Sequence, residues 1–289
     1  MIREYTICES EKQQLLSMKQ DVVDRLLAAA RVLDGYGRKI LTVGAYYPGI
    51  WLEHNQDNEF FVEYDPETAW NSQTLFLDFQ REDGLIPCAF KLASGTEPKF
   101  PQIQCVRSFV RSALEVARKC GRPEEDYARI YQAGCRYEEF LARYRNRAGS
   151  GLVEMFCEFD TGHDNSPRVT DGGIPPHCAD RDAAKMPDIP CMPVLSVDLS
   201  AMSYGNRTAL AEIAGLLGDD RGAKHWQCRA EEGKEKMRQL LYDPEDDFYY
   251  DRDRFGLRKY RTEYLTRLFL NGVTDPAEFD RLYDKWMDG

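Results

Sequence analysis

Residues 158–173 read EFDTGHDNSPRVTDGG, a run dense in acidic side chains that also carries one histidine and one arginine. The run has no apolar period, so it buries little surface by itself. Its Asp-Asn-Ser-Pro sequence suits a turn, while loops held by rigid elements commonly carry catalytic groups. Two interpretations stay open at this point, a solvated loop and an active-site loop in which a carboxylic acid transfers a proton.

Asp164 is the best candidate for such an acid, and the alternative is an Asp that caps a turn. Asn165 follows it and can donate from its amide, while Pro167 stiffens the loop. His163 either hydrogen-bonds a ligand and shapes a pocket, or is a solvated loop histidine. Arg168 either orders carboxylates within the loop or touches a substrate.

Other polar and aromatic residues could share a site with this loop. Gln104 is uncharged and suits hydroxyl groups, and Trp51 with Tyr46 and Tyr47 forms either a stacking wall or ordinary packing. We expect Asp198 to cap a helix. Three more acids lie nearby, namely Glu154, Glu158 and Asp160. Adjacent acids raise one another's pKa when they are buried, but we expect most of these three to be solvated.

Composition bounds the class of protein. The 289 residues are 43% hydrophobic, enough for a sizeable core, and we expect one domain over 1–289. The net charge is −11 with basic residues interspersed among acids, which argues against nucleic acid as a partner. No apolar run approaches the roughly 20 residues that span a bilayer, and the first residues lack a signal-like apolar core. We expect a cytoplasmic protein without a membrane partner.

Nine cysteines are scattered along the chain without a CxxC pair. We interpret them as reduced packing residues. A zinc site needs paired ligand spacing, and the nearest approach is His177 and Cys178 with Cys191. The sequence therefore predicts neither a metal site nor another cofactor.

Apolar periodicity predicts helix after helix with few strands. Short links join some helices and predict antiparallel pairs, whereas residues 149–193 are long and irregular. The predicted helices cover 10–33, 65–80, 104–119, 123–144, 198–217, 221–241, 260–271 and 276–286, with a tight turn over 242–253. The fold class is all-α, either a solenoid or an (α/α) toroid. Solenoids show a fixed repeat, and since none is found, we favour a toroid with long loops at one end.

Several motifs, in order, resemble the mannosylglycerate-hydrolase-like glycoside hydrolases, which are related to processing α-glucosidases and more distantly to trehalases. GLVEMFCEFDTGHDNSPRV (151–169) resembles the segment that carries their general acid. FQREDGLIP (79–87) resembles their Gln-x-x-Asp-Gly-x-Ile-Pro turn, and Gln104 stands where they have a Gln at the head of a helix. Three further landmarks are YRNRAGSGLVE (144–154), VDLSAM (197–202) and LYDPEDDFYYDRD (241–253).

The resemblance implies an (α/α)6 toroid that hydrolyses an α-glucosidic or α-mannosidic bond in a small glycoside or oligosaccharide, with inversion and without a cofactor. Asp164 would be the general acid. Glu53 or Asp57 could stand in for the family's Trp-Asp carboxylate, since the alignment is ambiguous there. The other substrate-binding candidates are Trp51, His54, Gln104, His163, Asn165 and Arg168.

One departure concerns the C-terminal part, where the family has its second catalytic carboxylate. This chain offers eight or nine predicted helices and no counterpart of that Glu, so we expect an incomplete toroid that lacks its C-terminal part. Its open edge would either self-associate through an exposed apolar stripe or leave the chain marginally stable. The stripe comprises Leu268, Phe269, Leu270, Phe279, Leu282, Tyr283 and Trp286.

Two alternatives of other classes remain. One is an inactive carbohydrate-binding or scaffold protein without the second carboxylate, and the other is a helical solenoid that binds protein.

Overall fold

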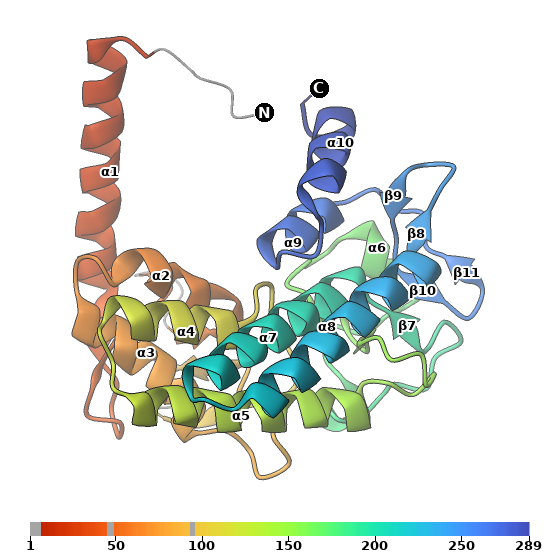
Figure 1. The fold of residues 1–289 in the computed structure, drawn as a ribbon, viewed down its shortest axis with the longest axis horizontal. Coiled ribbons are helices and arrows are strands. Elements are labelled where there is room, and N and C mark those ends of the chain that lie inside the picture. The colour runs from red at the N-terminus through yellow and green to blue at the C-terminus, as the bar shows by residue number, and fades with distance from the viewer. Residues whose placement is uncertain (1–6, 45–48, 93–95, 289) are drawn as a thin grey trace.

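Helices dominate the computed structural model, which describes residues 7–44, 49–92 and 96–288 (Figure 1). Ten α-helices lie within these residues. They are α1 (Glu9–Ala29), α2 (Asn58–Phe61), α3 (Pro66–Asp78), α4 (Phe109–Lys119), α5 (Glu124–Tyr144), α6 (Pro167–Thr170), α7 (Val197–Leu216), α8 (Asp220–Leu240), α9 (Tyr264–Leu270) and α10 (Pro276–Trp286).

The helix starts follow from capping chemistry. Asp65 accepts a hydrogen bond from the backbone N–H of Thr68, and Pro66 occupies the first helical position of α3. Asp275 and Pro276 do the same for α10. Ser196 caps α7 by accepting from the N–H of Leu199. Asp198, expected as a cap, is therefore already inside the helix.

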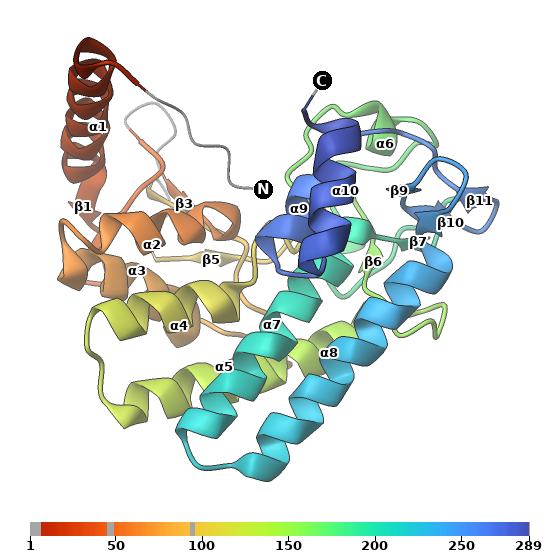
Figure 2. The same ribbon diagram turned by 45° about the horizontal axis from the view of Figure 1, so that its top comes forward.

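Helix α7 runs through the centre of the body, beside α5 and α8 (Figure 2). Most of its residues are buried on every side, as expected for a helix enclosed by others. It contributes Leu199 and Met202 to the larger hydrophobic cluster and Val197 and Ala201 to the smaller one. The two clusters thus meet along a single helix.

Short strands occur where the sequence predicted few. One sheet has the order β3-β4-β5 and another β11-β10-β7-β6, with β1-β2 and β8-β9 as separate antiparallel pairs. The strands are β1 (Ala30–Val32), β2 (Lys39–Leu41), β3 (Gly49–Trp51), β4 (Ala89–Lys91), β5 (Pro98–Lys99), β6 (Glu154–Met155), β7 (Val194–Leu195), β8 (Tyr242–Asp243), β9 (Phe248–Tyr249), β10 (Arg252–Asp253) and β11 (Gly256–Leu257). With two or three residues each, they are too short to produce a period-2 pattern.

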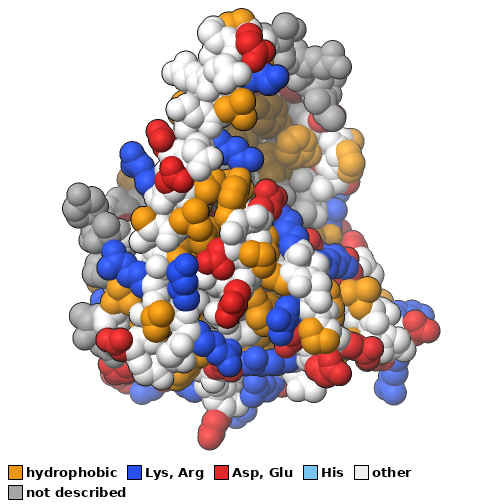
Figure 3. Space-filling model, turned by 90° about the vertical axis from the view of Figure 1, so that its left-hand side faces the viewer, with side chains coloured by type: hydrophobic (Ala, Val, Ile, Leu, Met, Phe, Trp, Pro, Cys, Tyr) orange, Lys and Arg blue, Asp and Glu red, His pale blue; other side chains and the backbone are white. Residues whose placement is uncertain are grey.

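Helix α1 differs from its prediction. It begins after Cys8, not after Ser10, and ends at Ala29, where the chain continues as β1. It stands away from the body (Figure 1). Three apolar side chains that recur along α1 with roughly helical spacing are about half exposed, with Leu15 at 53%, Met18 at 56% and Val22 at 50%. Figure 3 shows hydrophobic side chains gathered in a hollow beside the projecting part of the molecule.

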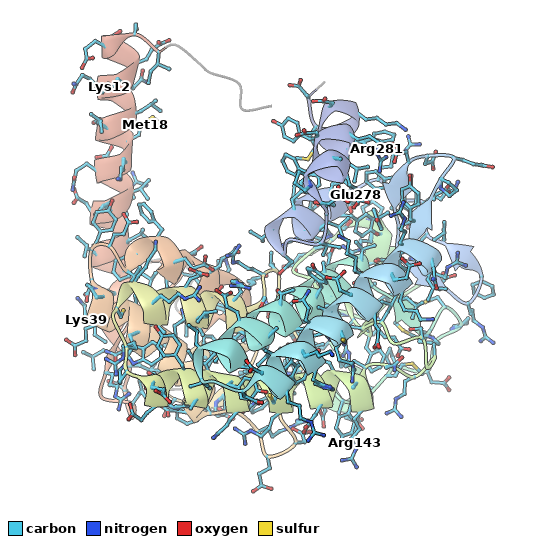
Figure 4. All side chains as sticks on the ribbon, viewed as in Figure 1. Lys12, Met18, Lys39, Arg143, Glu278 and Arg281 are labelled. Atoms are coloured by element: carbon cyan, nitrogen blue, oxygen red, sulfur yellow. The ribbon has the colours of Figure 1, made fainter. Side chains whose placement is uncertain are left out.

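Part of the apolar stripe expected to be exposed on the C-terminal helices is buried. Leu268 and Leu282 are fully buried, because both belong to the smaller hydrophobic cluster. Phe279 and Tyr283 remain exposed on α10. Glu278 and Arg281, labelled in Figure 4, bond to Tyr249 and Asp247 at the β8–β9 hairpin and so hold α10 against it.

No helix among the described residues combines the length and the apolar character that crossing a bilayer requires.

Candidate active site

A cavity of about 730 Å³ collects residues from segments far apart in the sequence. Trp51 comes from β3, Gln102 and Gln104 from the segment before α4, and Phe159 and Asp164 from the acidic run of residues 158–173, here named the acid loop. The rest of the lining is Arg81, Cys88, Ala89, Lys91, Pro98, Lys99, Phe100, Pro101, His177, Arg181 and Asp182. The cavity therefore offers the rings of Trp51, Phe100 and Phe159, several polar side chains, and the carboxylic acids Asp164 and Asp182.

Asp160 fastens the acid loop to the segment before α4. Its buried carboxylate pairs with the guanidinium of Arg145, which is also fully buried. It accepts further hydrogen bonds from the backbone N–H groups of Ile103 at 2.8 Å and Phe156 at 2.7 Å. The carbonyl of Asp160 accepts from the N–H of Cys105 at 3.2 Å. These bonds fix the position of Gln104 relative to Asp164.

Asp164 lies within the acid loop, where it is exposed and lines the cavity. Partial burial raises the pKa of its carboxyl above the usual range, and the negative charge of Glu158 raises it further. Glu158 is itself held by the backbone N–H of Asn165. A carboxyl with a raised pKa keeps its proton to higher pH, as a general acid requires.

Glu53 lies against the acid loop. The absence of a side chain at Gly162 leaves room for its carboxylate. A Cβ at Gly162 would overlap the Glu53 carboxylate, and the backbone there has a φ of 70°. Burial raises the pKa of Glu53. His54 and the hydrogen bond from Gln104 lower that pKa, and the charge of Asp164 raises it. His54 Nδ1 lies 3.7 Å from Glu53 Oε1. Asp164 thus lies close enough for its charge to raise the pKa of Glu53.

Asp57 has a different setting from Glu53. It ends the 3-10 helix Leu52–Asp57 and is more exposed than Glu53. Burial raises the pKa of Asp57, His54 lowers it and Glu59 raises it, whereas the charge of Asp164 acts on Glu53. Of the two carboxylates left open by the sequence, Glu53 is therefore the one that the fold places beside Asp164. Tyr46 and Tyr47, considered with Trp51 as a stacking wall, fall outside the described residues.

Arg168 is fully buried and its guanidinium is occupied by protein groups. It pairs with Asp198 at 2.6 Å and Asp251 at 2.8 Å, and lies over the ring of Tyr264. Of its two predicted roles, the contacts favour ordering carboxylates over touching a substrate. Asp198 is likewise an ion-pair partner and not a cap.

His163 is buried between this ionic cluster and α9. Its Nδ1 lies 2.7 Å from the guanidinium of Arg168, and its Nε2 lies against the carboxylate of Glu263. Because Nδ1 faces a group that can only donate, the ring is neutral with its proton on Nε2. Burial lowers the pKa of His163, in keeping with that form. Of the two alternatives for His163, a solvated loop histidine is therefore wrong.

Three acids expected to be mostly solvated are buried. Glu154 and Asp160 have no exposed surface, and Glu158 has 8%. Glu154 accepts hydrogen bonds from the backbone N–H groups of Arg147 and Ala148, at 2.7 and 2.6 Å. Backbone donors and ion pairs stabilise buried carboxylates, and sequence periodicity does not reveal such partners.

Gln104 lies in the segment before α4, five residues ahead of Phe109, and not at the head of the helix as expected. Its φ is 52°, a left-handed conformation that is unfavourable for a side chain with a Cβ. Its Nε2 donates to Glu53 Oε1 at 3.1 Å. Gln102 and His177, which sequence reasoning did not select, extend this contact into the cavity. They lie 75 positions apart, so no local motif could have linked them.

Among the described residues, one group has metal-ligand character, formed by Cys157, Asp160 and Cys178. The carboxylate of Asp160 is already taken by Arg145 and by backbone N–H groups. Its oxygens are therefore not available as metal ligands. The cluster fits packing better than metal binding.

Known proteins resemble this chain in both sequence and structure. The sequence model of the "mannosylglycerate hydrolase MGH1-like glycoside hydrolase domain" matches residues 58–288. A trehalase from Bombyx mori is 33% identical over 86 residues, which are 29% of this chain and 15% of that enzyme's length. The chain thus spans a small part of that relative.

The fold is that of (α/α) toroid enzymes. The GH63 mannosylglycerate hydrolase from Thermus thermophilus, solved with glucose, has a TM-score of 0.69 at 18% identity, covering 93% of this chain and 76% of that one. A neutral trehalase from Saccharomyces cerevisiae has a TM-score of 0.63 at 13% identity, covering 90% of this chain and 57% of that one. The toroid expected from the sequence is confirmed.

Proposed function

Since the chain belongs to the MGH1-like glycoside hydrolase family, we propose that it hydrolyses an α-glucosidic or α-mannosidic bond in a small glycoside with inversion. Asp164 is the general acid. Crystals of the Thermus enzyme hold glucose, Tris and D-glycerate, which supports a small polar ligand. We also propose a cytoplasmic location.

The observation that carries this proposal is the position of Asp164. It reaches a cavity large enough for a small sugar, and burial and Glu158 raise its pKa. Glu53, with Gln104 bonded to it, stands beside the acid loop. A proton donor next to fixed polar groups is the arrangement that glycosidic-bond cleavage needs.

The proposed reaction assigns a task to each group. Trp51 offers a ring face for the apolar side of a sugar, and Gln104 and Glu53 hold its hydroxyl groups. Asp164 protonates the leaving oxygen as the bond breaks. An inverting enzyme also needs a carboxylate that activates water, about 6.5–9.5 Å from the acid.

The water-activating carboxylate is not assigned. Among the described residues, Asp182 is the second carboxylate in the cavity lining, and Arg81 pairs with it at 3.1 Å. That ion pair directs the Asp182 carboxylate toward Arg81.

The experiment incubates the chain with paired α- and β-anomers of methyl and aryl glucosides and mannosides, and follows the products by ¹H NMR. We expect cleavage of an α-glycoside with the β-anomer of the sugar as the first product. An α-anomer as the first product would contradict inversion. Saturable sugar binding without any cleavage would instead support the carbohydrate-binding alternative.

A further inference from the structure

Four polar side chains form a continuous hydrogen-bonded chain, and three of them, Gln102, Gln104 and His177, line the cavity. Gln104 Nε2 lies 3.1 Å from Glu53 Oε1, and Gln102 Nε2 lies 2.7 Å from Gln104 Oε1. His177 Nδ1 lies 2.9 Å from Gln102 Oε1. The members come from the 3-10 helix after β3, the segment before α4, and the loop after the acid loop. We name this series the glutamine relay.

The donor and acceptor roles in the relay follow from Glu53, at which the relay ends. A carboxylate only accepts, so Gln104 must turn its NH₂ group toward Glu53. The carbonyl oxygen of Gln104 then faces Gln102, which must turn its own NH₂ group to it. The remaining carbonyl of Gln102 faces His177, and the ring must donate from Nδ1. Every bond in the relay therefore points toward Glu53.

Burial of Gln102 and Gln104 makes the hydrogen bonds of the relay costly to break. Gln102 is 5% exposed and Gln104 is 8% exposed, and leaving a buried amide without a hydrogen-bond partner destabilises the folded state. The left-handed φ of Gln104 adds backbone strain that persists only where neighbours hold it. Such strain is typical of functional positions.

The surroundings of His177 favour the neutral ring that the relay needs. Its ring packs edge-on against Phe159 with centroids 5.1 Å apart. Burial lowers the pKa of His177, and the positive charges of Arg181 and Lys91 lower it further. A neutral ring has one N–H, and Gln102 decides on which nitrogen it resides.

We propose that His177 and Gln102 are positioning residues that orient Glu53 and Gln104 for sugar binding. This inference rests on the proposed function, because it assigns a task within the same cavity. His177 fixes the amide of Gln102, which fixes the amide of Gln104 and hence the carboxylate rotamer of Glu53. The direction of the relay decides which amide atoms a sugar hydroxyl meets.

The first test is a ¹⁵N NMR measurement of histidine tautomers, which needs no turnover. The chain has only four histidines, so each signal can be assigned by substitution. We expect the Nδ1–H form for His177 in the wild type and a shift toward the Nε2–H form in Gln102→Met. The exposed His225 serves as the control and should not change. An Nε2–H form of His177 in the wild type, or no response to Gln102→Met, would overturn the relay.

The second test separates positioning from folding. His177→Asn keeps a donor where Nδ1 lies, whereas His177→Phe keeps the volume and loses the donor. We expect about a tenfold rise in KM for His177→Phe with a smaller change in kcat, and near-wild-type values for His177→Asn. Equal effects of the two variants would contradict the proposal. If the wild type cleaves no glycoside, the proposed function fails while the tautomer measurement still decides the relay.

Discussion

At the scale of single residues, the chemistry depends on how the acid loop sets the protonation of Asp164. The side chain is partly exposed, so its surroundings change its pKa through burial and through one negative neighbour, Glu158. Glu53 faces the same loop from the other side and is sensitive to the charge of Asp164. The protonation state of Asp164 therefore affects the pKa of Glu53.

Glu158→Gln tests the control of Asp164. The amide keeps an oxygen for the N–H of Asn165 but removes the negative charge, so the pKa of Asp164 should fall. A general acid is active only while protonated. We therefore expect the alkaline limb of the kcat/KM profile to move to lower pH, with little change at the acidic end. Glu82→Gln removes the same charge from an exposed turn and should leave the limb in place. An unmoved limb in Glu158→Gln would contradict the assignment.

Glu53→Gln tests how much the negative charge of the buried Glu53 carboxylate destabilises the folded state. Its folded pKa is raised by burial, so the folded state binds the proton more tightly than the unfolded state. Stability is then lost as pH rises from the unfolded pKa through the raised folded pKa. We expect Glu53→Gln to have a higher Tm than the wild type at pH 8 and about the same Tm at pH 3. A lower Tm at pH 8 would show that the charge stabilises the fold.

Residue identity alone predicted part of this site. Asp164, Glu53, Gln104 and Trp51 were selected from motifs, and the fold brings them to one cavity or its edge. Asp160 was expected to be solvated because nothing in its neighbourhood reveals Arg145 as a partner. Gln102 and His177 were missed for the same reason, since their contact is long-range.

At the scale of elements, the site depends on loops that a few buried ion pairs hold together. Arg145 follows the end of α5 and pairs with Asp160 in the acid loop. Its guanidinium also donates to the carbonyls of Glu154 and Ala183 at 2.9 and 2.8 Å. One side chain thus connects the end of α5 to the acid loop, to strand β6 and to the loop that contains Ala183.

Asp160→Asn should destabilise the protein strongly. It leaves the buried charge of Arg145 without its counter-charge, and breaking a buried pair in this way costs about 3–5 kcal/mol. Urea unfolding measures the change in unfolding free energy. Lys185→Met breaks an ion pair whose side chains are 53% and 75% exposed and is the matched control, with little expected change. Equal effects of the two substitutions would refute the anchoring role of Asp160.

Element ends were predictable where local chemistry sets them. Asp65-Pro66 and Asp275-Pro276 mark the starts of α3 and α10 in the sequence as in the structure. The short strands were not predictable, since cross-strand partners far away in sequence define them. For α1, periodicity indicated an apolar face, but periodicity does not reveal whether that face has a partner.

At the scale of the whole molecule, α7 joins the two hydrophobic clusters. A substitution at this helix therefore affects both clusters, and we propose that residues 1–289 unfold as one domain.

We propose that a second copy of the chain covers the exposed apolar side of α1. Leu15, Met18 and Val22 are about half exposed, and Met18 points toward the space that separates α1 from α10 (Figure 4). Phe279 and Tyr283 are exposed on α10. Apolar surface of this kind commonly marks an interface, and one chain carries both faces needed for self-association.

Light scattering coupled to size exclusion tests this proposal. We expect the wild type to elute as a dimer or larger species and the double variant Leu15→Glu/Met18→Glu to elute as a monomer. Lys12→Glu changes another side of α1 (Figure 4) and should leave the assembly intact. A monomeric wild type at micromolar concentration would contradict the proposal.

The role of Asp164 as general acid is the central claim, and its dependence on the leaving group tests it most directly. The rates of wild type and Asp164→Asn are compared on a methyl α-glycoside, whose leaving oxygen needs a proton, and on the matching α-glycosyl fluoride, which needs far less assistance. We predict a loss of about 10²–10⁴-fold in kcat on the methyl glycoside and at most about tenfold on the fluoride. Equal losses on both substrates, or an unchanged rate on the methyl glycoside, would contradict the assignment of Asp164.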